Sequence, residues 1–142
     1  MNQEPIVMEC RLNSPADKVW LALTEKDKMK QWYFDIENFK AELGFEFQFD
    51  GGSEEKKYLH LCKITELVPG EKLAYSWRYE GYPGGSLVTF DLIEEAGITR
   101  LMLTHEGLES FPANNPDFTK ENFIAGWNDI IGTNLKDFVE KL

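Results

Sequence analysis

The C-terminal segment, residues 121–142, repeats large apolar side chains at intervals of three and four residues. They are Phe123, Trp127, Ile130, Ile131, Leu135, Phe138 and Leu142. This spacing places them on one side of a helix with about 3.6 residues per turn. The side chains between them are polar: Asn128, Asp129, Thr133, Lys136, Asp137, Glu140 and Lys141. The segment therefore predicts one long amphipathic helix, whose apolar side the rest of the chain must cover.

Two glycines, Gly126 and Gly132, interrupt this helical pattern. Each should destabilise a helix interior by about 1 kcal/mol relative to alanine. We therefore expect a local requirement for them, such as the close approach of a strand or of a ligand.

Composition limits the class of protein. The 142 residues predict one domain, 1–142, with a sizeable core. Ten Phe, five Tyr and four Trp predict an interior rich in aromatic rings. Fifteen basic and twenty-five acidic side chains give a formal charge of -10, which opposes binding to phosphate backbones. We therefore predict no nucleic-acid partner.

The cysteines and the N-terminus indicate the compartment. Cys10 and Cys62 are too few for a secreted disulfide framework, so both are predicted to be reduced thiols. The N-terminus has no secretory pattern, and the chain has no long apolar run. We expect a cytoplasmic protein without a membrane span. Motifs for phosphate, dinucleotide or zinc binding are also missing from the sequence, so no cofactor is predicted.

The order of the remaining patterns predicts the fold. Residues 6–13 alternate as a strand, and Ser14-Pro15 begins a short helix with Ser14 as N-cap. A second short helix is predicted from about Thr24 to Trp32. From Gly44 to His105, patterns of period two alternate with turn residues and predict five consecutive antiparallel strands. Layer rules then favour an α+β helix-grip fold, in which a curved antiparallel sheet of about six strands wraps around the long C-terminal helix.

Several short segments occur together in a characteristic order. They are Ser14–Trp20, Leu23-Thr24, Leu73–Trp77, Val88–Phe90, Thr99–Gly107 and Gly126-Trp127. In this combination, the chain from about residue 6 to 142 resembles the SRPBCC superfamily of START and Bet v 1-like domains. Within it, the chain is similar to the group related to the activator of heat-shock-protein-90 ATPase. The resemblance implies a curved sheet that grips the C-terminal helix, with an elongated apolar cavity between them. Some members bind lipids, sterols, hormones or polyketides there.

Residues of the predicted inner faces are candidates to line such a cavity. They are Trp32, His60, Tyr75, Trp77, Val88, Phe90, Leu103, His105, Phe123, Trp127 and Ile131. The leading hypothesis is non-catalytic binding of a small apolar or aromatic molecule, such as a lipid, a sterol or a polyketide-like compound, by a monomer or homodimer. One alternative is a stress-response module that contacts a chaperone. Another is a cyclase- or dehydratase-type enzyme with His105 as general base.

These hypotheses differ in what they require of the structure. A void between sheet and final helix favours the ligand binder and the enzyme, whereas a filled core with an exposed apolar patch favours the chaperone module. His60, Cys62 and His105 can share one face of the sheet, but a metal site needs more convergent ligands and a second shell. We therefore assign no metal ligand and no catalytic residue.

Overall fold

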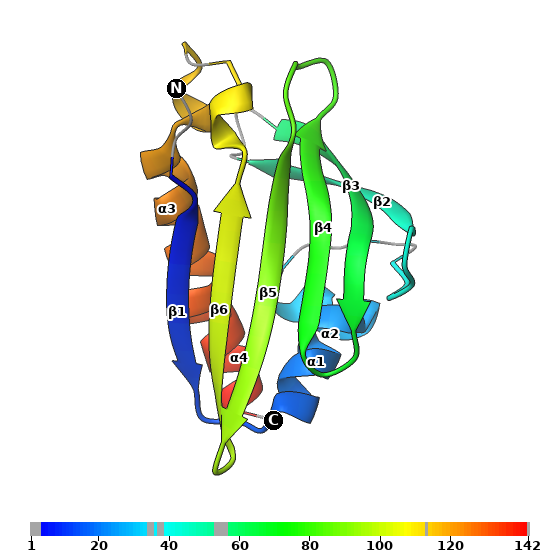
Figure 1. Ribbon diagram of the computed structural model, residues 1–142, viewed down its shortest axis with the longest axis vertical. Helices are drawn as coiled ribbons and strands as arrows, with labels where there is room; N and C mark the ends of the chain where they lie inside the picture. The colour runs from blue at the N-terminus through cyan, green and yellow to red at the C-terminus, as the bar shows by residue number, and fades with distance from the viewer. Residues whose placement is uncertain (1–3, 34–35, 37–38, 53–56, 113, 142) are drawn as a thin grey trace.

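The computed structural model describes residues 4–33, 36, 39–52, 57–112 and 114–141. One antiparallel sheet has the strand order β1-β6-β5-β4-β3-β2 (Figure 1). Its strands are β1 (Ile6–Leu12), β2 (Glu46–Gly52), β3 (Lys57–Val68), β4 (Lys72–Tyr79), β5 (Ser86–Glu95) and β6 (Ile98–Glu106). The strands β2 to β6 form a meander, and β1 pairs with β6 from Ile6 opposite His105 to Leu12 opposite Thr99.

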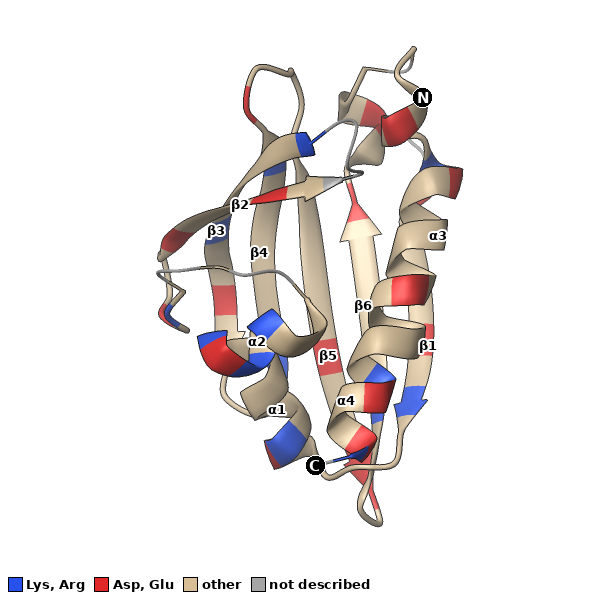
Figure 2. Ribbon diagram, turned by 180° about the vertical axis from the view of Figure 1, so that it is seen from behind, with Lys and Arg blue, Asp and Glu red and all other residues tan. Residues whose placement is uncertain are grey.

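The helices cover one face of this sheet (Figure 2). The short helices α1 (Ala16–Thr24) and α2 (Lys26–Trp32) follow β1, and α3 (Lys120–Asp129) begins the C-terminal helix. Short 3-10 turns, η1 (Leu108–Ser110) and η2 (Pro116–Phe118), connect β6 to α3. Strand alternation directs one set of side chains toward the helices and the other set outward, as the burial pattern of β6 shows. The predicted helix-grip α+β fold is confirmed.

The start of α1 differs from the prediction. Its N-cap is Pro15, and the Ser14 hydroxyl forms no hydrogen bond with any described residue, so Ser14 as N-cap was wrong. The first free amide of the helix, that of Ala16, instead donates to the carboxylate of Glu94 on β5 at 2.6 Å. The Ser14 carbonyl accepts from the Thr99 hydroxyl at 2.7 Å. Tertiary contacts to the β5–β6 hairpin therefore hold the start of α1. Capping rules consider only residues near the helix end in the sequence, so they do not predict these contacts.

The C-terminal helix is not one uninterrupted α-helix. A π-helical stretch, η3 (Ile130–Leu135), separates α3 from α4 (Lys136–Glu140). The buried positions recur at every fourth residue: Phe123, Trp127, Ile131, Leu135 and Val139. An α-helix rotates these positions by about 40° per four-residue step, because four residues exceed one turn. The wider π-turn corrects this drift and keeps the stripe on the sheet.

The π-turn also changes which side chains the helix buries. Ile130 and Phe138 were predicted within the buried stripe, but both are only half-buried. Val139 is buried in the last turn instead. Leu142, also predicted in the stripe, lies outside the described residues. A period measured on an ideal helix cannot anticipate this change of register.

The two helical glycines do not mark a close approach. A Cβ atom added to Gly126 or to Gly132 would meet no atom within 4 Å, so the expected contact with a strand was wrong. Replacing Gly126 by alanine should therefore raise the free energy of unfolding by about 0.5–1 kcal/mol, because alanine loses less backbone entropy in a helix. Urea denaturation of the two proteins measures this difference.

Gly107 provides a matched control for this substitution. It has φ = 88°, and an added Cβ atom would lie 3.1 Å from the Gly85 carbonyl oxygen. Gly107→Ala should therefore destabilise the fold. Loss of stability in Gly126→Ala as well would contradict the expected gain.

Candidate functional site

The residues predicted to line a cavity lie together between the sheet and the helices. All are buried, and the most accessible of them, Phe123, is only 8% exposed. His60, Tyr75, Trp77, Val88, Phe90, Leu103 and His105 come from strands β3 to β6, and Phe123, Trp127 and Ile131 come from the C-terminal helix. We call this layer the grip interior.

Rings in mutual contact occupy the centre of the grip interior. The centroid of the Trp77 ring lies 5.6 Å from that of Trp127 and 5.6 Å from that of His105. Phe90 packs edge-on against Trp127 at 6.0 Å, and Phe123 against His105 at 5.2 Å. A ligand that enters this layer must therefore displace a ring.

Trp32 is placed differently from the other candidates. Its indole Nε1 donates to the Ala22 carbonyl at 2.8 Å, which ties α2 to α1. Its ring stacks on Tyr33 with centroids 4.9 Å apart. Trp32 therefore borders the grip interior through Tyr33.

The hydrogen bonds of His105 define its tautomer. The indole Nε1 of Trp127 donates to Nδ1 of His105 at 3.0 Å. Because an indole nitrogen can only donate, Nδ1 must be unprotonated and the ring proton resides on Nε2. Nε2 lies 2.7 Å from the Ser86 hydroxyl and donates to it, and that hydroxyl donates to the Trp77 carbonyl at 3.3 Å. Both ring nitrogens of His105 and the Ser86 hydroxyl therefore have hydrogen-bond partners.

This arrangement does not suit His105 to general-base chemistry with Ser86. A base that activates the serine would need its lone pair on Nε2, which would put a proton on Nδ1 directly against the Trp127 N–H. Burial also lowers the pKa of His105 to about 3, so the ring is neutral at pH 7. His105 and its two partners therefore form a structural link between β5, β6 and α3. A sequence pattern could not predict these hydrogen bonds, because Ser86 and Trp127 are 19 and 22 positions away from His105.

His60 is the second buried histidine. Its Nδ1 donates to the Tyr58 carbonyl at 2.9 Å, and its ring stacks on Phe49 with centroids 4.6 Å apart. Burial lowers the pKa of His60 to about 4. Among the residues that the structure describes, no three histidine, cysteine or acidic side chains are grouped as metal ligands.

The two cysteines lie in separate parts of the sheet. Cys10 is on β1 and Cys62 is on β3, with β6, β5 and β4 between them. At about 4.8 Å per strand, this separation along the sheet far exceeds the reach of a disulfide. Burial raises the pKa of both thiols.

Tyr33 is a residue of this site that the sequence analysis missed. It follows α2 and is half-buried, and its ring contacts Trp32, Phe49 and Trp127 at centroid distances of 4.9, 5.9 and 6.5 Å. Its hydroxyl is hydrogen-bonded to that of Tyr75 at 2.7 Å. Tyr33 thus spans from α2 to the strands and the final helix. The only sequence signal was a second aromatic residue directly after Trp32.

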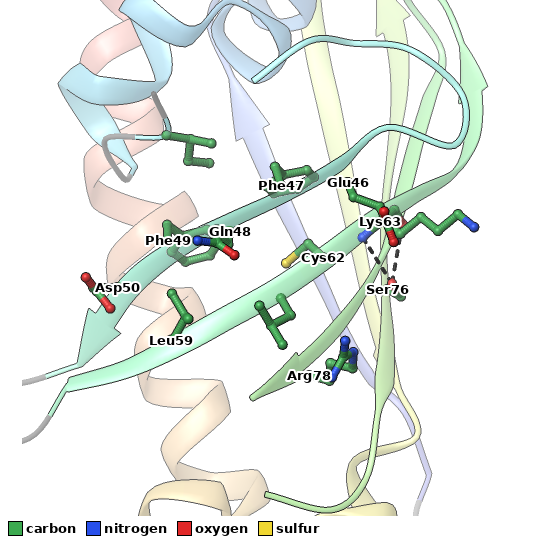
Figure 3. A pocket seen from close by; sticks show the side chains of 12 residues that line it. Glu46, Phe47, Gln48, Phe49, Asp50, Leu59, Cys62, Lys63, Ser76 and Arg78 are labelled. Carbon is green, nitrogen blue, oxygen red and sulfur yellow. Dashed lines mark hydrogen bonds between the residues drawn. The ribbon is translucent and has the colours of Figure 1, made fainter. Parts of the chain in front are cut away.

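A cavity of about 730 Å³ is found elsewhere, at strands β2, β3 and β4 (Figure 3). Most of the side chains that line it belong to the outward-facing set of these strands. They are Glu46, Gln48, Asp50, Leu59, Leu61, Lys63, Ser76 and Arg78. We call it the outer cavity. No sequence pattern indicated it, because its lining residues come from three strands that only strand pairing brings together.

Comparison with known families identifies the class of protein. The sequence model of the family "Activator of Hsp90 ATPase homolog 1-like protein" matches residues 13–140. The chain therefore belongs to this family, and the resemblance to the SRPBCC superfamily is confirmed. No curated protein matches the chain significantly. In the described part of the chain, no helix has the length and apolarity needed to cross a membrane.

Solved structures share the fold. Protein CV1439 from Chromobacterium violaceum superposes with a TM-score of 0.81 at 23% identity, over 96% of this chain and 97% of that one. Bacillus halodurans protein BH1534 gives 0.76 at 26% identity, over 99% and 100%. DynU16, from the dynemicin biosynthetic locus, gives 0.79 at 20% identity over 97% of this chain, which spans only 48% of DynU16. Similarity at this level indicates a shared fold and does not identify a ligand.

Proposed function

We propose that the protein binds a small aromatic molecule in the grip interior without transforming it. The observation that carries this proposal is an interior of neutral aromatic rings that contains a few paired hydroxyl and indole groups. Ligand sites are commonly lined in this way, by apolar and aromatic side chains with few polar groups. Polyketide-like compounds, with fused rings and hydroxyl groups, have the matching chemistry.

Tyr33 is the ring that a ligand would displace. It is half-buried, whereas Tyr75, Phe90 and Trp127 are almost fully covered. Its departure would leave the buried Tyr75 hydroxyl without the partner that lies 2.7 Å away. A hydroxyl group on the ligand would restore that hydrogen bond and fix the orientation of the ligand. Burial raises the pKa of Tyr75, so the group remains a neutral donor and acceptor.

Replacing Tyr33 by alanine should create a site for a small aromatic probe. We expect 2-naphthol to bind Tyr33→Ala at least about tenfold more tightly than it binds the wild type, because it no longer competes with the phenol ring. Binding should quench tryptophan fluorescence, since Trp32 and Trp127 border the vacated space. At a concentration of about 100 times the Kd, it should stabilise the variant by about 2.7 kcal/mol.

Controls test both the place and the polar contact. Tyr82 is 36% exposed and packs edge-on against Tyr58 and Phe118 outside this layer, so Tyr82→Ala should leave probe affinity unchanged. Naphthalene should bind Tyr33→Ala about fivefold more weakly than 2-naphthol, and adding Tyr75→Phe should remove that difference. If 2-naphthol binds the wild type and Tyr33→Ala equally, the site is not in the grip interior.

The chaperone-module alternative has less support. The large apolar side chains that are exposed in the described structure lie on separate elements: Val7, Leu21, Leu43, Val68, Tyr82 and Ile93. Two of them, Val68 and Ile93, line one shared hollow. Singly exposed apolar residues are normal on soluble proteins and do not indicate a docking surface.

A further inference from the structure

Most residues that line the outer cavity lie on the opposite side of the sheet from the grip interior, and the buried Phe47, Phe49 and Cys62 contribute to the lining from the inner side. Phe49, Cys62 and Trp77 point inward, so their neighbours Gln48, Leu61 and Arg78 point outward. The strand register sets Gln48, Leu61 and Arg78 in one row across the three strands. A volume of about 730 Å³ is within the range of small-molecule sites.

The outer cavity has an apolar floor between opposite charges. Leu59 and Leu61 on β3 are half-buried and form this floor. Asp50 faces Leu59 from β2, whereas Arg78 faces Leu61 from β4. Figure 3 shows Asp50 and Arg78 on opposite sides of Leu59. From strand spacing and residue rise, their Cα atoms are about 12 Å apart.

The two charged side chains at the ends of the floor, Asp50 and Arg78, are available to a ligand. Neither Asp50 nor Arg78 forms an ion pair with a described residue. Glu46 and Lys63 also line the cavity, and they occupy directly opposite positions of β2 and β3. Side chains in such positions are adjacent, so these two charges offset each other. Of these four side chains, Asp50 and Arg78 therefore present a negative and a positive charge that have no charged partner opposite them in the cavity.

We propose that the outer cavity is a second binding site, for a small zwitterionic amphiphile that carries an ammonium group and a carboxylate at opposite ends of an apolar chain. The ammonium group pairs with Asp50, the carboxylate pairs with Arg78, and the chain covers Leu59 and Leu61. A ligand with a single charge would pair with either Asp50 or Arg78 and leave the other side chain without a partner from the ligand. This site is independent of the function proposed for the grip interior.

A titration with matched probes tests the proposal. The ¹⁵N-labelled protein is titrated with 8-aminooctanoic acid, octanoic acid and octylamine, and amide shifts are followed by NMR. We expect saturable shifts at Gln48, Leu61 and Arg78, with the zwitterion bound at least about threefold more tightly than either analogue, the contribution of one exposed ion pair. Salt at about 1 M should remove this preference, because it screens exposed charges.

Surface variants separate the two charges. Arg78→Gln should reduce the affinity for the zwitterion to that for octylamine, and Asp50→Asn should reduce it to that for octanoic acid. Arg100→Gln is the matched control, since Arg100 is on the outer face of β6 and already pairs with Glu9. It should leave all three affinities unchanged.

Each contrary outcome rejects the proposal. These outcomes are the absence of saturable shifts at the outer cavity, equal affinities of the three probes, and no effect of Arg78→Gln or Asp50→Asn. Shifts confined to Tyr33 and Trp127 would place the probes in the grip interior and also reject it. Tyr33 is not among the residues that line the outer cavity, although its ring contacts Phe49, which is. Because the charges that hold the zwitterion are those of Asp50 and Arg78, Tyr33→Ala should leave the preference for the zwitterion over octanoic acid and octylamine unaltered, so the two sites can fail separately.

Discussion

Trp127→Ala is expected to lower the free energy of unfolding by about 5 kcal/mol. Trp127 is 2% exposed and packs against Trp77, Phe90 and His105. Truncating a buried aromatic side chain to alanine typically costs about 3–5 kcal/mol. The variant also leaves Nδ1 of His105 without its donor, which adds about 1–3 kcal/mol. Since small domains are stable by only about 5–15 kcal/mol, the variant should be close to unfolding at 25 °C. Guanidinium denaturation monitored by circular dichroism measures the difference.

Two further variants separate the contributions of Trp127. Trp127→Phe keeps most of the ring and removes only the N–H group, so its cost should be about 1–3 kcal/mol. Trp20 on α1 is half-buried, and Trp20→Ala should cost clearly less than Trp127→Ala. Equal losses in Trp20→Ala and Trp127→Ala would show that Trp127 is not the central packing residue of the final helix.

The fold was predictable because its main signals are local. Period-two alternation in β1 and in β4 identified the strands and their inner faces, and the spacing of Phe123, Trp127 and Ile131 identified the helix face. One buried face per element and short connections leave few ways to assemble such elements. The same reasoning placed the candidate residues in one layer.

Contacts between distant residues account for what the sequence analysis missed. Glu94 caps α1 from another element, and Tyr33 reaches Tyr75 across 42 positions. The π-turn at Ile130–Leu135 arises because the helix must follow the sheet over several turns, which no helical propensity encodes. The outer cavity is lined by residues of three strands, which lie side by side only once the sheet has formed. Features of this kind depend on the assembled sheet, so a linear pattern does not contain them.

Acidification from pH 6.5 to 5 is expected to destabilise the protein steeply. The chain has two histidines, and burial lowers the folded-state pKa of His105 to about 3 and that of His60 to about 4. Their unfolded pKa is about 6.5, so below that pH the unfolded chain binds two protons that the folded protein does not. The contribution of the two histidines to the free energy of unfolding is therefore fully present above pH 6.5, and it is lost as the pH falls toward their folded-state pKa values. The full losses are about 5 kcal/mol for His105 and about 3 kcal/mol for His60.

The slope of stability against pH identifies the histidines. Near pH 5.5, the free energy of unfolding should fall by roughly 2.5 kcal/mol per pH unit, because almost two protons are taken up on unfolding and most carboxylates are still ionised. His60→Phe keeps a ring stacked on Phe49 and removes one titrating group, so its slope should be about half as steep. Urea denaturation at closely spaced pH values measures both slopes. A slope below about 0.5 kcal/mol per pH unit in the wild type would mean that the histidines are protonated in the folded protein, which is incompatible with the hydrogen bond from Trp127 to Nδ1 of His105.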